Sequence, residues 1–154
     1  MAQLQSGAAA PSFSLLDQDA NTVSLSEFAG KKLLLYFYPK ADTPGCTAQA
    51  CSIRDEMPNL SGLGIAVVGI SPDKPSELQK FKGKYDLNFP LLSDPQHKTA
   101  DEYGTWGKKS KYGREYEGII RSSFLLDEQG KVIQSWYKVS PKDTVPFARQ
   151  ALAG

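Results

Sequence analysis

The pattern of apolar and polar positions predicts an alternation of buried strands and amphipathic helices. Leu33–Tyr38 is continuously apolar and rich in aromatic residues, and Ile65–Ile70 contains two valines and two isoleucines. Such runs are typical of central strands that are covered on both faces of a sheet. Nearer the N-terminus, Ser12–Leu16 and Thr22–Ser24 flank a polar stretch, which predicts a hairpin of two short strands.

A helix is predicted between the two apolar runs. Thr43 suits the N-cap, Pro44 suits the first helical position, where its missing N–H costs nothing, and Pro58 is expected to end the helix. One apolar face is formed by residues at i, i+4, i+7 and i+11: Cys46, Ala50, Ile53 and Met57. The order strand–helix–strand predicts a βαβ unit with parallel strands.

The rest of the chain continues this alternation. We expect helices at Pro75–Tyr85, Lys98–Tyr103 and Thr144–Ala153. We expect strands at Pro90–Ser93, Ile119–Asp127 and Lys131–Tyr137, the last two paired as an antiparallel hairpin, and a loop at Gly104–Gly118. This order predicts an α/β protein with a central mixed sheet flanked by helices. It resembles the thioredoxin fold with an added N-terminal β-hairpin.

The 154 residues suit a single domain, in which we expect residues 1–6 to form a flexible arm. The formal net charge is +1, so the charge balance asks for neither nucleic acid nor a membrane as a partner. The longest apolar run is far too short to span a bilayer. Residues 1–10 contain no lysine or arginine and no apolar segment of the secretory kind, which makes a cytoplasmic location the default.

The chain has two cysteines, Cys46 and Cys51, and one histidine, His97. This set is too small for a structural zinc site, and neither a metal nor another cofactor is expected. In a reducing compartment, two nearby thiols are more often redox-active than structural. His97 follows a polar loop and is interpreted as an ordinary exposed residue.

Cys46 follows a buried strand and falls in the first turn of the predicted helix. Unpaired N–H groups and the helix dipole at that position favour an anion, and therefore a thiolate. A cysteine on an apolar helix face can equally be a simple core residue. Three neighbours favour a reactive role for Cys46: the Thr43 hydroxyl, Gly45, which lets the backbone approach a ligand closely, and the Cys51 thiol. Arg121, expected in a hydrophobic strand, either serves an anion or lies at an exposed strand end.

These residues carry a specific resemblance. Pro39-x-x-x-Thr43-x-x-Cys46 resembles the active-site motif of the peroxiredoxins. Cys46-x4-Cys51 is similar to the pattern of the Q-type peroxiredoxins, also called bacterioferritin comigratory proteins, and the likeness runs from about Gly7 to the last helix. Two more segments match that pattern: Tyr103-Gly104-x-Trp106-Gly107 and Arg121-Ser122-Ser123-Phe124-Leu125.

The resemblance implies an activity and a role for each residue. The chain would be a thiol-dependent peroxidase that reduces hydrogen peroxide and organic hydroperoxides. Cys46 would be the peroxidatic thiol, and Cys51 would resolve its sulfenic acid as an intramolecular disulfide that thioredoxin, glutaredoxin or a similar dithiol reduces. Pro39 would shield the pocket from water, and an intramolecular resolving step fits a monomer. Three residues would bind and activate the peroxide: Thr43, Gly45 and Arg121.

Thiol ionisation alone does not make a fast peroxidase. Lowering the pKa of a thiol from about 8.5 to about 6 raises the thiolate fraction at pH 7 roughly 30-fold. The same change lowers the intrinsic nucleophilicity of the sulfur roughly 13-fold, for a Brønsted slope of about 0.45. The net gain is about twofold, so groups that stabilise the charge moving onto the peroxide oxygens must supply the rest.

The spacing of the two cysteines makes a further prediction. In an ideal α-helix, residues five apart have Cα atoms about 8.7 Å apart. A disulfide needs a Cα–Cα distance of about 4.4–6.8 Å. A bond between Cys46 and Cys51 therefore requires that at least the first turn of the helix melts.

Two other functions remain open at this point. A thioredoxin-like thiol–disulfide oxidoreductase would act on protein disulfides, although the four-residue gap between the cysteines and the lack of a proline beside Arg121 disfavour it. A redox-switched sensor or holdase would use the same helix melting as a switch. A basic cluster is interpreted as a solvated loop, with the alternative that it steers an acidic reductase: Lys108, Lys109, Lys111 and Arg114.

Overall fold

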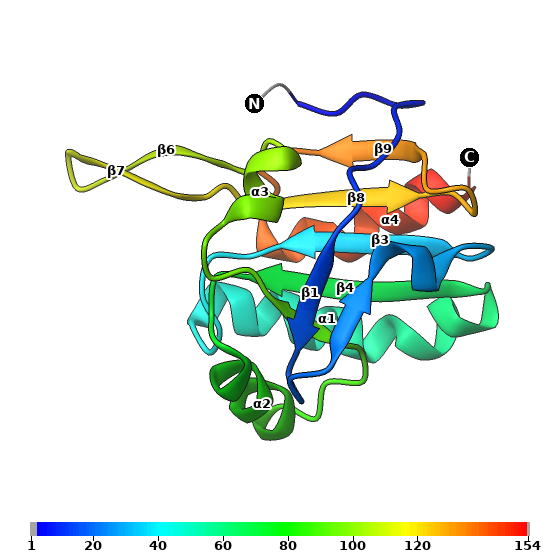
Figure 1. Ribbon diagram of the computed structural model, residues 1–154, viewed down its shortest axis with the longest axis horizontal. Coiled ribbons are helices and arrows are strands. Elements are labelled where there is room, and N and C mark those ends of the chain that lie inside the picture. Colours follow the sequence, from blue (N-terminus) through cyan, green and yellow to red (C-terminus); the bar gives the residue numbers. More distant parts are fainter. Residues whose placement is uncertain (1–2, 154) are drawn as a thin grey trace.

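A mixed seven-stranded sheet forms the centre of the protein (Figure 1). The computed structural model describes residues 3–153. In spatial order the strands are β2 (Thr22–Ser24), β1 (Ser14–Asp17), β5 (Leu91–Ser93), β4 (Ile65–Ser71), β3 (Lys32–Phe37), β8 (Ser122–Leu126) and β9 (Val132–Trp136). Strands β3, β4 and β5 are parallel, and the other pairs are antiparallel. This sheet confirms the predicted α/β class and the N-terminal hairpin.

Helices cover both faces of the sheet. One face is covered by α1 (Pro44–Gly62), α2 (Pro75–Lys84) and α4 (Thr144–Ala153), and the other by α3 (Lys98–Glu102) and the 3-10 turn η1 (Leu25–Phe28). A second 3-10 turn, η2 (Pro141–Asp143), leads into α4. Strand β3 divides its side chains between the faces. Leu34 and Tyr36 pack toward α1, Leu35 and Phe37 pack toward α3, and all four are buried, as a continuous apolar run predicts.

Helix α1 extends further than the sequence predicts. Pro58 is expected to end it, but the helix continues through Pro58 to Gly62. A proline inside a helix leaves the carbonyl four residues earlier without its N–H partner. That carbonyl belongs to Arg54, and the side-chain amide of Asn88 donates to it at 3.2 Å. The missing hydrogen bond is replaced from outside the helix, so the prediction was wrong for a reason that lies elsewhere in the chain.

The segment predicted as a loop, Gly104–Gly118, contains a second sheet. Strands β6 (Trp106–Lys111) and β7 (Arg114–Ile119) form an antiparallel hairpin that projects away from the main sheet (Figure 1). Its turn residues Tyr112 and Gly113 both have positive φ, 53° and 76°, as two-residue hairpin turns require. Most of its side chains are exposed, so it lacks the apolar alternation that marks a strand with one buried face.

This hairpin also corrects the expected strand Ile119–Asp127. Ile119 ends β7 and Ser122 begins β8, so that Ile120 and Arg121 form the connection between the two sheets. Arg121 is therefore not enclosed within a hydrophobic strand. It stands where the chain passes from the exposed hairpin into the buried sheet.

The N-terminal segment lies along β9. The N–H of Gly7 donates to the carbonyl of Val132 at 2.7 Å, and the N–H of Leu4 donates to the hydroxyl of Tyr137 at 2.9 Å. The first two residues of the chain lie outside the described part of the structure. The flexibility expected of residues 1–6 stays a prediction.

Candidate active site

Cys46 lies in the first turn of α1, just beyond the carboxyl end of β3. Pro44 takes the first helical position, as predicted, and Thr43 precedes it with an extended backbone. Thr43 stands at the N-cap position but makes no capping hydrogen bond with its side chain; its hydroxyl donates to the carbonyl of Lys40 at 2.8 Å. Cys46 is only 1% exposed. The start of a helix favours an anion, whereas burial disfavours one, so a thiolate at this position depends on a positive charge beside it.

Arg121 reaches this thiol from the connection between β7 and β8. Its Nη2 donates to Cys46 Sγ at 3.3 Å, and its Nη1 donates to Gln49 Oε1 at 2.5 Å. Gln49 Nε2 in turn donates to the hydroxyl of Thr144, at the start of α4, at 2.8 Å. These hydrogen bonds fix the orientation of the guanidinium group and bring its positive charge against the sulfur.

Gln49 is not among the site residues that the sequence predicts. It is fully buried, three residues after Cys46, on the side of α1 that faces the core. Buried polar side chains need hydrogen-bond partners, so a glutamine next to the predicted apolar face of the helix was the available signal. The partners themselves come from distant segments and leave no local trace.

Gly45 makes room for the guanidinium group. A Cβ atom at this position would lie 3.3 Å from Arg121 Nη2 and 3.4 Å from Pro141 Cγ. Any side chain would therefore push against Arg121 or against η2. The sequence predicts that Gly45 admits a ligand; the structure shows that it also admits Arg121.

Two aspartates fasten the loop between β3 and α1. The buried carboxylate of Asp73 accepts a hydrogen bond from the N–H of Ala41 at 2.7 Å. Asp42 accepts hydrogen bonds from Lys84 Nζ at 2.9 Å and from the Tyr85 hydroxyl at 2.7 Å, both at the end of α2. The bond from Lys84 first, and that from Tyr85 second, hold the pKa of Asp42 below its usual range. The loop that precedes Cys46 is thus tied to two neighbouring elements.

Two cavities adjoin the hairpin β6–β7 beside this site. One, of about 570 Å³, is bordered by Pro39 and Thr43. The other, of about 550 Å³, is bordered by Arg121. Lys109 borders both of them. Three of the predicted site residues therefore line hollows that are large enough for a small ligand.

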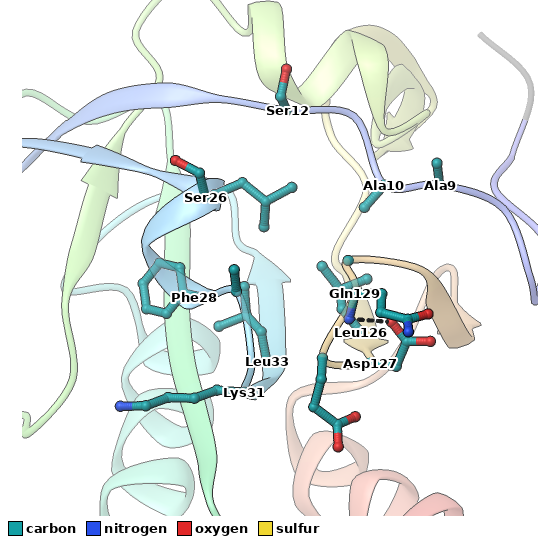
Figure 2. A pocket seen from close by; sticks show the side chains of 14 residues that line it. Ala9, Ala10, Ser12, Ser26, Phe28, Lys31, Leu33, Leu126, Asp127 and Gln129 are labelled. Carbon is teal, nitrogen blue, oxygen red and sulfur yellow. Dashed lines mark hydrogen bonds between the residues drawn. The ribbon is translucent and has the colours of Figure 1, made fainter.

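A third hollow lies at the other end of the sheet (Figure 2). It holds about 300 Å³ and is bordered by Leu33, near the start of β3, and by Leu126, at the end of β8. Cys46 follows the opposite end of β3. The described residues that border this hollow include no cysteine, histidine or arginine, so it is separate from the thiol site.

Cys51 lies on α1 five residues after Cys46, half-buried, and both thiols are free. Regular helix geometry places their Cα atoms about 8.7 Å apart, beyond the reach of a disulfide. The structure brings the two cysteines onto one helix without joining them. A bond between them needs a rearrangement of α1.

His97 takes no part in this cluster. Its Nδ1 lies 3.0 Å from Asp101 Oδ2, and its ring stacks on Trp106 with the ring centroids 3.8 Å apart. Within residues 3–153, no three or more histidine, cysteine, aspartate or glutamate side chains are grouped so that they could hold a metal ion. That same part of the chain contains no helix with the length and apolar character needed to cross a membrane.

Comparisons with known proteins agree with this geometry. The family described as AhpC/TSA matches residues 6–135. A putative peroxiredoxin Bcp of Haemophilus influenzae is 53% identical over 143 residues, which is 93% of this chain and 92% of the relative. Peroxiredoxin Bcp of Escherichia coli K12 is 52% identical over 132 residues, which is 86% of this chain and 85% of the relative.

Solved structures share the fold. Peroxiredoxin Q of Xanthomonas campestris superposes with a TM-score of 0.86 at 32% identity, over 92% of this chain and 90% of that one. A structure of the bacterioferritin comigratory protein of the same species, which concerns its alkyl peroxide reduction activity, gives a TM-score of 0.85 at 30% identity with the same coverage. These likenesses confirm the predicted thioredoxin-like fold. The chain belongs to the AhpC/TSA family, among the Bcp or Q-type peroxiredoxins, and is a thiol-dependent peroxidase.

Proposed function

We propose that Cys46 is the peroxidatic thiol. The observation that carries this assignment is the 3.3 Å hydrogen bond from Arg121 Nη2 to Cys46 Sγ at a buried helix start. The thiolate attacks one oxygen of the hydroperoxide, so that an S–O bond forms and the O–O bond breaks. The leaving alkoxide or hydroxide takes up a proton and departs as an alcohol or as water. Cys46 is left as a sulfenic acid.

Negative charge moves onto the peroxide oxygens in this step, so fixed donors are needed beside them. Arg121 supplies one, and the backbone N–H of Gly45, unpaired in the first turn of α1, supplies another. Thr43 already donates its hydroxyl proton to a backbone carbonyl, so its oxygen is the atom that accepts the O–H of a hydroperoxide. Pro39 carries no N–H and borders the same cavity as Thr43; we assign it to excluding water.

The second step closes an intramolecular disulfide. The Cys51 thiol attacks the sulfenic sulfur of Cys46, forming an S–S bond and releasing water. A dithiol such as thioredoxin or glutaredoxin then restores both thiols. Because both cysteines lie on one chain, a monomer suffices for the cycle. Dithiol reductants and reduced cysteines belong to reducing compartments, which supports a cytoplasmic location.

Both hydrogen peroxide and organic hydroperoxides are proposed as substrates. The cavity of about 550 Å³ that Arg121 borders has room for an alkyl group. The alkyl peroxide reduction activity of the Xanthomonas campestris relative supports the same substrate class.

Peroxide turnover by the wild type, Cys46→Ser and Cys51→Ser tests the assignment. Stopped-flow measurements with hydrogen peroxide and tert-butyl hydroperoxide should show no reaction in Cys46→Ser. Cys51→Ser should complete one rapid turnover and then climb toward sulfinic acid in excess peroxide. Equal first-turnover rates in the wild type and Cys46→Ser contradict the proposal. Sustained consumption with a thioredoxin system separates this cycle from that of a sensor, which would stop after one turnover.

A further inference from the structure

Lys109 differs from the other basic residues of the hairpin β6–β7. Lys108 and Lys111 are exposed, whereas Lys109 is half-buried and its Nζ donates to the carbonyl of Ile119 at 2.7 Å. Its register partner across the hairpin is Tyr116, three residues earlier than Ile119. The Lys109 side chain therefore runs along the hairpin toward the main sheet instead of into solvent.

The carbonyl that Lys109 holds lies two residues before Arg121. The next two residues are also held, by backbone hydrogen bonds to neighbouring segments: the N–H of Ile120 donates at 2.7 Å, and the carbonyl of Arg121 accepts at 2.9 Å. Lys109 adds a side-chain hydrogen bond to this set. It fixes the backbone where the chain passes from the exposed hairpin to the thiol site.

Lys109 and the thiol of Cys46 also interact electrostatically. Burial lowers the pKa of Lys109 most, the positive charge of Arg121 lowers it further, and negative charge on Cys46 raises it. The three groups therefore share one electrostatic environment. Lys109 is also the residue that the two cavities beside the site have in common, among the described residues that line them.

We propose that Lys109 is a positioning residue of the peroxidase reaction. By holding the Ile119 carbonyl it sets the connection that carries Arg121 against Cys46, and its ammonium group adds a second positive charge to the cavities that adjoin the site. The proposal rests on the assignment of Cys46 as the peroxidatic thiol. Lys109 then has a role that the exposed lysines of the hairpin do not share. A role of the whole basic cluster in solvation or in docking a partner would not set Lys109 apart from them.

Three variants test this role: Lys109→Met, Lys109→Arg and the control Arg114→Met, which changes an exposed arginine of the same hairpin. The rate constant for the first reaction with hydrogen peroxide is measured by stopped flow. Lys109→Met should slow it by between about 10-fold and 10²-fold, because Arg121 loses part of its fixed placement. Lys109→Arg, which keeps a charged donor, should stay within about threefold of the wild type, and Arg114→Met should equal the wild type.

A second measurement tests the effect of the Lys109 charge on the Cys46 thiol. Alkylation of Cys46 by iodoacetamide, a neutral reagent, is measured against pH in the same variants. Its midpoint should move to higher pH in Lys109→Met, because one cation fewer stabilises the thiolate, and should stay unchanged in Arg114→Met. A loss that arose only from looser packing would leave this midpoint in place.

Wild-type peroxide rates in Lys109→Met would overturn the proposal. So would a Lys109→Arg variant as slow as Lys109→Met, since the loss would then not depend on the charged donor. Circular dichroism checks the fold of each variant. If Lys109→Met does not fold, Lys109→Gln replaces it, and a wild-type rate in Lys109→Gln counts equally against the proposal. Peroxide consumption by Cys46→Ser in the same series would instead contradict the peroxidatic assignment.

Discussion

The hydroxyl of Tyr85 donates to the carboxylate of Asp42 at 2.7 Å and so joins the end of α2 to the loop that leads into α1. Lys84 donates to the same carboxylate at 2.9 Å. Asp42 has a left-handed backbone conformation, with φ of 59°, which few non-glycine residues adopt. These side-chain bonds hold the turn immediately before Thr43. The end of α2 therefore restrains the loop that leads into the start of α1.

Tyr85→Phe should make the start of α1 easier to open, because it removes one hydrogen bond and keeps the ring. We expect the Cys46–Cys51 disulfide to form roughly two- to fivefold faster, the range expected for losing one exposed interaction of this kind. Less Cys46 should then reach the sulfinic acid in excess peroxide. Mass spectrometry after short peroxide pulses measures the ratio of the two products. The control Tyr112→Phe changes a 94% exposed ring on the hairpin tip and should leave that ratio alone; an unchanged ratio in Tyr85→Phe would count against the restraint.

Arg121 and Gln49 should act on the chemical step more than on ionisation of the thiol. Arg121→Ala removes a transition-state donor and should slow peroxide attack by about 10²-fold or more. Gln49→Leu keeps Arg121 but removes the hydrogen bond that holds its guanidinium group. It should slow peroxide attack by about 10-fold. Stopped-flow rates and the pH profile of Cys46 alkylation are compared in each variant. If the change in the alkylation profile accounts for the whole loss of rate, the role in the chemical step is wrong.

The contact between Arg121 and Gln49 also shows which parts of the site the sequence can predict. The βαβ unit around Cys46 could be predicted because its signals are local: two apolar runs, and Pro44 at the start of the helix. Arg121 and Gln49 are 72 residues apart, and no periodicity reports such a pairing. The cost of burying an unpaired arginine and the family resemblance both pointed to Arg121, whereas the pairing of Gln49 with Arg121 became visible only when both side chains had been placed.

Two departures from the predicted elements have the same origin in long-range structure. Pro58 stays inside α1 because Asn88, 34 residues after Arg54, supplies the replacement hydrogen bond. The hairpin β6–β7 was missed because neither of its faces packs against the main core along most of its length. Apolar periodicity reports burial, so an element that is mostly exposed gives no such signal.

Glu56 and Arg149 tie α1 to α4 and give the stability of the protein a pH dependence. Arg149 Nη2 donates to Glu56 Oε1 at 2.6 Å, its Nε donates to the other oxygen, and Asn59 also donates at 2.8 Å. These bonds, Arg149 first, lower the pKa of Glu56. A carboxylate whose pKa is lowered in the folded state stabilises it above the unfolded pKa, and the stabilisation is lost as the pH falls through the folded value.

Arg149→Ala should therefore lower the midpoint of thermal unfolding at pH 7, by about 2–6 °C for a chain of this size. The difference from the wild type should shrink as the pH is lowered from 5 toward 3, because protonated Glu56 no longer gains from the arginine. Scanning calorimetry over that range measures both effects. Lys142→Ala, a change at an exposed lysine in the turn before α4, is the control and should follow the wild type. A difference that does not depend on pH would show that Arg149 acts through packing alone.

The side-chain hydrogen bonds that attach helix α1 to its neighbours differ before and after Cys51. This difference determines how much of the helix should unfold on oxidation. Beyond Cys51, Arg54 Nη1 donates to the carbonyl of Tyr85 at 2.7 Å, and the Arg54 carbonyl accepts from Asn88. Before Cys51, the buried Gln49 is the residue whose side chain joins the helix to α4 and to the thiol site. The first turns therefore depend on contacts that the formation of a disulfide would break. The segment from Arg54 onward has separate attachments to α2 and to the loop that follows it.

Oxidation of Cys46 and Cys51 to a disulfide should thus melt α1 from its start up to about Cys51 and leave the helix from Arg54 onward in place. In a regular helix the two Cα atoms lie about 8.7 Å apart, and a disulfide tolerates only a shorter span. Hydrogen exchange should quicken across residues 43–52 in the oxidised protein and not beyond them, with a matching loss of far-UV helical signal. Cys51→Ser treated with one equivalent of peroxide is the control, because it is oxidised without forming the bond and should keep its protection. A disulfide-form crystal structure with residues 43–57 still fully helical would defeat the prediction, and with it the view that unfolding of this segment belongs to the catalytic cycle.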